Sequence, residues 1–450
     1  MPLDDLLTTD TLPSSIASAV KRRPSSTEEL FGFGIAPRDM LRRVGWNSLG
    51  TILARGKGVL LLPLSLIVLG RSGYGLTTVA FATAAFLAPI FVLNIPDGAA
   101  VLVVGASTHL VAERRIWIIR RLCVRCALAT VALAIPVAVL AHSRLVWWTA
   151  ALTAAIILFK GSTIHLQYFQ QAARLMRIQT LAEYMSAFGL LLALWGGPFA
   201  MIATSAAVLA IASAFAWRTL ALTSTASTAS DGTERHFWRA AMRLSLPLLP
   251  AAMSQWALLS VDSLLIYHQL GASSAGVYSA AYSLSSVALI VPLALNAVWF
   301  PTAQRVLALP WRDARRFIRR LTMWVIVASA LAVAVTAVLA PIVGTIVLHQ
   351  TLAKAARCVP WIVLGFSFLA IARVGEGILY ARKHSILILA SYLVAALVNL
   401  GLNLYWIPRL GILGAAYATA VGYGLLCVLE SFAAIHQLRR SSRNVARARP

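Results

Sequence analysis

Five basic residues lie inside long apolar stretches of the sequence. Arg125 lies close to the end of its stretch, where its side chain can reach the membrane interface, and the other four are Arg55, Lys57, Lys160 and Arg373. In lipid, such a residue costs about 2.5–3.5 kcal/mol at mid-helix, so its presence calls for a reason. Arginine and lysine side chains combine a positive charge with several N–H donors, and this combination binds anions. We therefore treat the four residues as candidates for an anion-binding site. The alternative is that their long side chains carry the charge to the membrane interface, and for Lys160 both interpretations stay open.

Three acidic residues also fall within apolar stretches: Asp97, Asp262 and Glu376. A carboxylate inside a membrane protein can bind a coupling proton or Na⁺, or can compete with a bound anion for nearby cations. Glu376 follows Arg373 by one helical turn, so the alternative there is a structural ion pair. The alternative for Asp262 is a hydrogen bond between helices.

No residue pattern in the chain is typical of an enzyme or a metal centre. The eight histidines form no HExxH motif, and there is no glycine-rich phosphate-binding loop. Cys123 and Cys126 form a CxxC pair, but it lacks the βαβ context of a redox motif and the second ligand pair of a zinc site. We therefore expect no catalytic residues, no metal, no cofactor and no direct use of ATP.

The composition places most of the chain in lipid. Of the 450 residues, 60% are hydrophobic and only 12% are charged, whereas soluble domains carry about 25% charged residues. The net charge of +24 would suggest nucleic acid in a soluble protein. Here the basic residues follow membrane topology instead, so we expect no nucleic-acid partner.

Twelve apolar stretches are long enough to cross a bilayer, which takes about 20 residues. They must be helices, because lipid offers no partner for an unpaired backbone group, and their apolar runs do not alternate as barrel strands do. Two further acids, Glu183 and Glu430, are expected at the membrane interface. The twelve predicted spans are 47–69, 76–103, 122–141, 145–168, 179–196, 198–217, 246–270, 276–300, 321–345, 358–380, 385–407 and 411–436.

The distribution of Lys and Arg sets the orientation. Most of them collect before the first span, after each even-numbered span and at the C-terminus, which marks this side as cytoplasmic. The opposite side holds only five, which are Arg71, Arg144, Lys354, Arg357 and Arg409. Both termini are therefore predicted to be cytoplasmic. On this topology Arg55, Lys160 and Arg373 each lie about eight residues, or roughly 12 Å, inside the cytoplasmic helix ends.

The chain divides into two halves around a polar segment. Residues 1–45 are expected to be a disordered cytoplasmic tail without a cleaved signal peptide. Residues 46–218 form the predicted N-terminal lobe and 244–436 the C-terminal lobe, each with six helices. The Ser/Thr-rich segment within 219–243 predicts a cytoplasmic linker, and 437–450 a basic cytoplasmic tail.

The two halves resemble each other in sequence. A shift of 201 residues aligns Gly70 with Gly271 and Gly75 with Gly276, and it also aligns the arginine pairs 114–115 and 315–316. Because six is an even number of spans, both repeats enter the membrane in the same direction, which predicts two pseudo-symmetric bundles around a central cavity. Pro89 and Pro292 fall late in equivalent helices and are candidate hinges, with static bending as the alternative.

Three segments resemble a known family: 245–284, 402–423 (LNLYWIPRLGILGAAYATAVGY) and 73–82 (GYGLTTVAFA). They are similar to Wzx-type polysaccharide flippases of the multidrug/oligosaccharidyl-lipid/polysaccharide (MOP) exporter superfamily, and the likeness extends over about 45–436. The resemblance implies an all-helical, MATE-like fold in a bacterial plasma (inner) membrane. It also implies flipping of a polyprenyl-diphosphate-linked oligosaccharide to the outer leaflet, for exopolysaccharide, surface-polysaccharide or O-antigen synthesis.

The resemblance gives the candidate residues specific roles. Arg55, Lys57, Lys160 and Arg373 would bind the substrate diphosphate; the acids Asp262, Glu376 and Asp97 would couple an ion or release the headgroup. The expected partners are the lipid-linked oligosaccharide, membrane lipids and a polysaccharide polymerase or export machinery. A multidrug/cation antiporter of the same superfamily is the main alternative, although it would need more buried acids and fewer buried cations. An integral-membrane enzyme would need a larger outer loop, and lipid II flipping would suit a fourteen-helix chain better.

Overall fold

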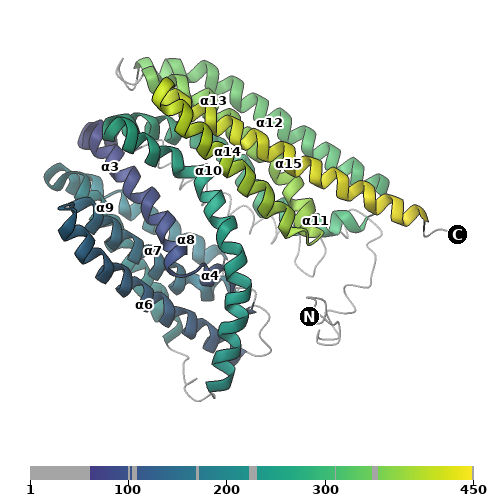
Figure 1. The fold of residues 1–450 in the computed structure, drawn as a ribbon, viewed down its shortest axis with the longest axis horizontal. Coiled ribbons are helices and arrows are strands. Elements are labelled where there is room, and N and C mark those ends of the chain that lie inside the picture. The colour runs from purple at the N-terminus through teal and green to yellow at the C-terminus, as the bar shows by residue number, and fades with distance from the viewer. Residues whose placement is uncertain are drawn as a thin grey trace.

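A computed structural model shows a protein built of helices over all the residues that it describes (Figure 1). These residues are 61–99, 102–103, 109–168, 172–221, 231–309, 311–346 and 353–447. Arg55 and Lys57 lie outside them, as do the predicted N-terminal tail and most of the first predicted span. The helices of the N-terminal half are α3 (Leu62–Phe91), α4 (Ile95–Gly98), α6 (His109–Leu140), α7 (Arg144–Tyr168), α8 (Ala172–Ser186) and α9 (Gly189–Ala221). They are followed by α10 (Asp231–Ser285), a 3₁₀ turn (Ser286–Leu289), α11 (Ile290–Ala308), α12 (Trp311–Ile346), α13 (Ala353–Ala381), α14 (Ser385–Leu410) and α15 (Ile412–Arg447).

Nine helices in the described part of the chain are long and apolar enough to cross a membrane. Their outward faces are apolar as well: on α12, for example, the side chain of Trp324 is 72% exposed. Since an exposed apolar belt of this kind is stable only in contact with lipid, the protein is a multi-pass integral membrane protein.

Three of the nine helices bend sharply at a glycine, each time between two of the predicted spans. The glycines are Gly70 in α3, Gly197 in α9 and Gly271 in α10, with φ values of 66°, 59° and 81°. Positive φ is costly for residues with a Cβ but not for glycine, so these positions allow the chain to turn back. A straight helix of 55 residues, the length of α10, would measure about 80 Å, far more than the bilayer thickness. Each of these three helices therefore covers parts of two predicted spans, and residues 47–60 of the first span lie outside the described residues.

Residues that the 201-residue shift aligns also meet in space. Gly75 of α3 and Gly276 of α10 lie back to back, so a Cβ on Gly75 would overlap the carbonyl oxygen of Ala272, and one on Gly276 would overlap that of Arg71. The hydroxyl oxygens of Thr78 and Ser279 are 2.9 Å apart. Equivalent residues of two repeats touch only where a two-fold axis passes between them, so this contact supports the predicted internal repeat.

The helices form two bundles that α10 connects. Helices α3, α6, α7 and α9 pack together, and α11 to α15 form the second group. In Figure 1 the two groups meet where α3 lies beside α10, and they diverge towards the opposite end. Each bundle has its own apolar core, with Ile119 and Ile157 in the first and Phe366 and Tyr423 in the second.

The start of α10 differs from the predicted linker. Residues 231–243, expected to lie in a linker, are helical, and Phe237 and Ala241 are buried in the core of the N-terminal bundle. The second part of α10, with Leu258 and Tyr278, belongs to the core of the C-terminal bundle. The apolar residues spaced along this helix bury more surface by packing than a solvated linker would. The other predicted lobe boundaries stay predictions.

Both candidate hinge prolines lie beside interruptions in helices. Pro89 is two residues before the end of α3, and its carbonyl accepts a hydrogen bond from the backbone N–H of Asn94, which has positive φ. Pro292 is buried near the start of α11, directly after the 3₁₀ turn. Breaks at equivalent places in both halves are consistent with hinges as well as with static bends, so the hinge role stays a prediction.

The contact between the repeats predicts a specific cross-link. In a variant whose four native cysteines are replaced by serine or alanine, Thr78→Cys with Ser279→Cys should form a disulfide, because the two side chains already touch. The measurement is gel mobility without reductant after cleavage at a protease site inserted between residues 222 and 230. Joined halves are the expected result.

The matched control pairs Ser279→Cys with Thr83→Cys, because Thr83 lies five residues, or about 7.5 Å along α3, beyond Thr78. Adding Gly75→Ala should lower the cross-linking yield, since the new Cβ forces α3 away from α10. Equal yields for both cysteine pairs would show that this contact is wrong.

Candidate functional site

One predicted cation and one predicted acid form an ion pair in the N-terminal bundle. The Nζ atom of Lys160 on α7 lies 2.8 Å from Oδ2 of Asp97 on α4, and the two side chains are 38% and 50% exposed. The neighbouring Gly98 packs directly against Ser245 of α10. The pair therefore lies close to where α10 crosses the N-terminal bundle, and its charges are accessible from outside the protein. The sequence singled out both residues but not their pairing.

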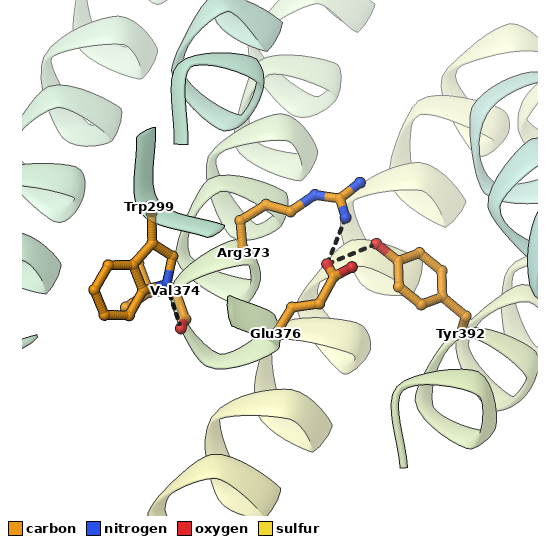
Figure 2. Close-up of polar contacts among 5 residues, drawn as sticks. All are labelled: Trp299, Arg373, Val374, Glu376 and Tyr392. Carbon is orange, nitrogen blue, oxygen red and sulfur yellow. Dashed lines mark hydrogen bonds and ion pairs between the residues drawn. The ribbon is translucent and has the colours of Figure 1, made fainter. Parts of the chain in front are cut away.

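Arg373 and Glu376 form a second ion pair, which is buried. Both residues lie on α13, are less than one-tenth exposed, and have Nη1 and Oε2 atoms 2.5 Å apart. The Tyr392 hydroxyl of α14 donates to the same Oε2 at 3.2 Å. Figure 2 shows the guanidinium and the tyrosine approaching the Glu376 carboxylate from different directions. This is the structural ion pair that sequence reasoning held as the alternative for Glu376.

The neighbouring turn of α13 is held by α11. The indole N–H of Trp299 donates to the Val374 carbonyl at 3.0 Å (Figure 2), and the ring covers Gly377, where a Cβ would overlap it. Arg373 is thus fixed among α11, α13 and α14, and its guanidinium is turned inward. For Arg373 to bind a diphosphate, the ion pair with Glu376 would have to open, so its predicted direct contact with substrate has no support in this conformation.

Asp262 joins two helices of the C-terminal bundle. The residue is buried on α10, and its carboxylate accepts hydrogen bonds from the Tyr278 hydroxyl, from Thr419 of α15 at 3.2 Å and from the Ser263 backbone N–H at 2.9 Å. Because three hydrogen-bond donors contact this one carboxylate, they stabilise its negative charge in place of a cation. This is the hydrogen bond between helices that was the alternative for Asp262.

Two buried charged residues were not expected from the sequence. Arg120, assigned to the cytoplasmic end of α6, is 3% exposed, donates to the Ser162 carbonyl at 3.0 Å and lies over the Trp217 ring. Glu430 of α15, expected at the interface, is completely buried. Glu430 lies six residues before the end of the predicted span 411–436, and this position in the sequence could have indicated that it is buried. Periodicity cannot show which face of such a helix meets another helix, because the lipid-facing side is apolar as well.

The hydrogen bonds to Asp262 predict a stability effect. Tyr278→Phe removes a donor from a buried carboxylate, so it should lower the free energy of unfolding by about 1–3 kcal/mol. The measurement is denaturant unfolding of the purified protein in detergent. Tyr405→Phe is the matched control, because Tyr405 is exposed on α14 and should change stability little. Equal effects of the two substitutions would contradict a structural role for this hydrogen bond.

Comparisons with known proteins agree with this fold. The model of the polysaccharide biosynthesis protein family matches residues 40–306, more than half of the chain. No curated protein matches the chain. The fold is similar to a lipid II flippase, MurJ, in an inward closed conformation, with a TM-score of 0.64, 14% identity, and 87% of each chain covered.

Two multidrug transporters of the MATE family are also similar. One, from the MOP superfamily in an inward-facing conformation, has a TM-score of 0.59 at 13% identity, covering 90% of this chain and 99% of its own. The other, a mutant of the Vibrio cholerae transporter VcmN, has a TM-score of 0.58 at 14% identity, covering 90% and 98%. The family match confirms the predicted likeness to a polysaccharide family, and the fold is the predicted fold of MOP transporters. The chain belongs to the polysaccharide biosynthesis protein family and has the fold of the MOP superfamily.

Proposed function

We propose that the protein is a flippase that moves a polyprenyl-diphosphate-linked oligosaccharide from the inner to the outer leaflet of a bacterial plasma membrane. The observation that carries the proposal is the combination of a polysaccharide biosynthesis family with the fold of a lipid II flippase. A glycan built on a lipid carrier needs a protein of this kind, because its diphosphate and sugars cannot cross hydrocarbon unaided. The product would serve surface-polysaccharide, exopolysaccharide or O-antigen synthesis, together with a polymerase or export machinery.

In this proposal, basic residues at the level of the inner membrane half bind the diphosphate. Lys160 supports it best, because its ammonium group is accessible and, within the described part of the chain, is held by a single carboxylate, Asp97. A diphosphate carries more charge than one carboxylate and can therefore displace it, after which Asp97 competes for the same cation and assists release. Arg55 and Lys57 are included among the diphosphate-binding residues because of their positions in the sequence. Arg373 can bind the diphosphate only when its ion pair with Glu376 is open.

Transport would follow alternating access of the two bundles around a central cavity, with both termini in the cytoplasm. The back-to-back contact of α3 and α10 supports a closed outer side in the described conformation, because the sequence places this turn outside. Opening it would separate the bundles and bend the helices near Pro89 and Pro292. Asp262, Glu376 and Asp97 remain candidates for coupling this motion to an ion.

A multidrug/cation antiporter is the second candidate, because the chain shares its fold with MATE transporters. Such a transporter needs acids that can receive a cationic drug. Here the candidate acids are already matched: Asp97 by Lys160, Glu376 by Arg373, and Asp262 by three hydrogen-bond donors. This internal pairing favours the anionic lipid-linked substrate.

The flippase proposal predicts that removing the candidate diphosphate-binding cations slows transport. The assay uses proteoliposomes that contain a fluorescent polyprenyl-diphosphate oligosaccharide. The single variant Lys160→Ala and the double variant Arg55→Ala with Lys57→Ala should each lower the flipping rate about tenfold or more. This decrease corresponds to a loss of about 1.4 kcal/mol of binding free energy. Flipping is measured by quenching the outer-leaflet label.

Arg144→Ala, on the opposite side of the membrane, is the control and should keep the wild-type rate. Wild-type rates in all variants would argue against diphosphate capture by these residues. Transport of a cationic dye instead of the lipid would favour the antiporter.

A further inference from the structure

Glu430 is a fully buried carboxylate that has no hydrogen-bond partner among the described residues. Its exposed fraction is 0%, and both carboxylate oxygens are without a donor. The other two buried acids of this bundle are different, because Asp262 accepts three hydrogen bonds and Glu376 accepts two. Nothing in the sites described above uses Glu430.

Glu430 lies directly against the Arg373–Glu376 pair. Helices α13 and α15 approach so closely that a Cβ on Gly375 would be 2.9 Å from the Glu430 carbonyl oxygen. The charged or titratable groups that interact electrostatically with Glu430 are Arg373 and Glu376 of α13, Tyr392 of α14 and Cys427 of α15 itself.

The charges in this cluster do not balance if every group is ionised. Arg373 contributes one positive charge, whereas Glu376 and Glu430 would contribute two negative charges. Arg373 already forms its short ion pair with Glu376, so the remaining negative charge would fall on the carboxylate without donors. A buried, unpaired and unsolvated carboxylate is strongly unfavourable, and it is relieved by binding a positive ion.

A proton suits this position better than a metal cation. Hard cations such as Na⁺ require several oxygen ligands, and Glu430 shares its surroundings with a guanidinium, which would repel a second cation. A proton needs only one carboxylate oxygen and produces a neutral carboxyl group. Arg373 also retains an N–H donor, at Nε, that has no partner among the described residues.

We propose that Glu430 is a proton-binding site and that Arg373 is shared between Glu430 and Glu376. With the proton on a Glu430 oxygen, Arg373 pairs with Glu376, as the structure shows. When the O–H bond breaks and the proton leaves to water, the guanidinium turns towards the new Glu430 carboxylate and weakens its hold on Glu376. The proton site stands on geometry alone, and only its use in coupling rests on the proposed function.

The position of the cluster connects a proton to the packing of the bundle. Glu430 lies nine residues before Arg439 on α15, about 13 Å inside the cytoplasmic charges, which matches the depth of Arg373 on α13. A movement of Arg373 would change the contact of Glu376 with Tyr392 of α14. It would also displace the turn of α13 to which Trp299 of α11 is hydrogen-bonded. Protonation can therefore shift four helices against each other.

The test is infrared difference spectroscopy of the purified full-length protein between neutral and alkaline buffer, in which exposed carboxylates stay ionised. The wild type should show the carbonyl band of a protonated carboxylic acid, and Glu430→Gln should remove it. Glu376→Gln should also remove it, because Arg373 then has only Glu430 as a partner and keeps that carboxylate ionised. Glu183→Gln, which changes an exposed acid on α8, should leave the band in place.

The proposal is overturned if Glu430→Gln keeps the band, or if the band shifts when Na⁺ is added at constant pH. Unchanged thermal unfolding of Glu430→Gln in detergent checks folding, since the amide replaces a neutral carboxyl group of the same shape. Because this assay needs no substrate, it remains informative even if the protein flips no lipid. In flipping proteoliposomes, a pH gradient should change the wild-type rate but not that of Glu430→Gln.

Discussion

The hydrocarbon layer supplies neither hydrogen-bond partners nor counter-charges, and this constraint explains most of the structure. Backbone groups satisfy it by forming helices throughout the described residues. Charged side chains satisfy it by pairing, as in Lys160 with Asp97 and Arg373 with Glu376. Glu430 is the exception among the buried acids of the described residues, and it is for this reason that it stands out as a site of proton binding.

The two bundles have different electrostatic characters. In the N-terminal bundle the Lys160–Asp97 pair is accessible, which suits exchange with an anionic ligand. In the C-terminal bundle the Arg373 cluster and the Asp262 hydrogen bonds are buried between helices. A transporter needs both an accessible substrate contact and an internal element whose packing can change. The proposed flippase would place the first in one bundle and the second in the other.

Helix α10 is the mechanical link between these parts. Its first segment packs in the N-terminal core through Phe237, and its second segment carries Asp262 and Tyr278 in the C-terminal core. Gly271 bends α10 between Asp262 and Tyr278, beside the contact of Gly75 with Gly276. A change in either bundle is therefore transmitted to the contact on the pseudo-two-fold axis.

The sequence by itself determined the membrane class, the helical architecture and the internal repeat. Composition and the length of apolar runs are sufficient for the first two, because lipid permits few structures, and matching glycines such as Gly70 and Gly271 revealed the repeat. It also singled out Lys160, Asp97, Arg373, Glu376 and Asp262 as unusual. Only the tertiary structure decided which charges pair, that Arg373 and Glu430 face inward, and that 231–243 is helical. A membrane helix is apolar towards both lipid and its neighbours, so its periodicity does not reveal which side is buried.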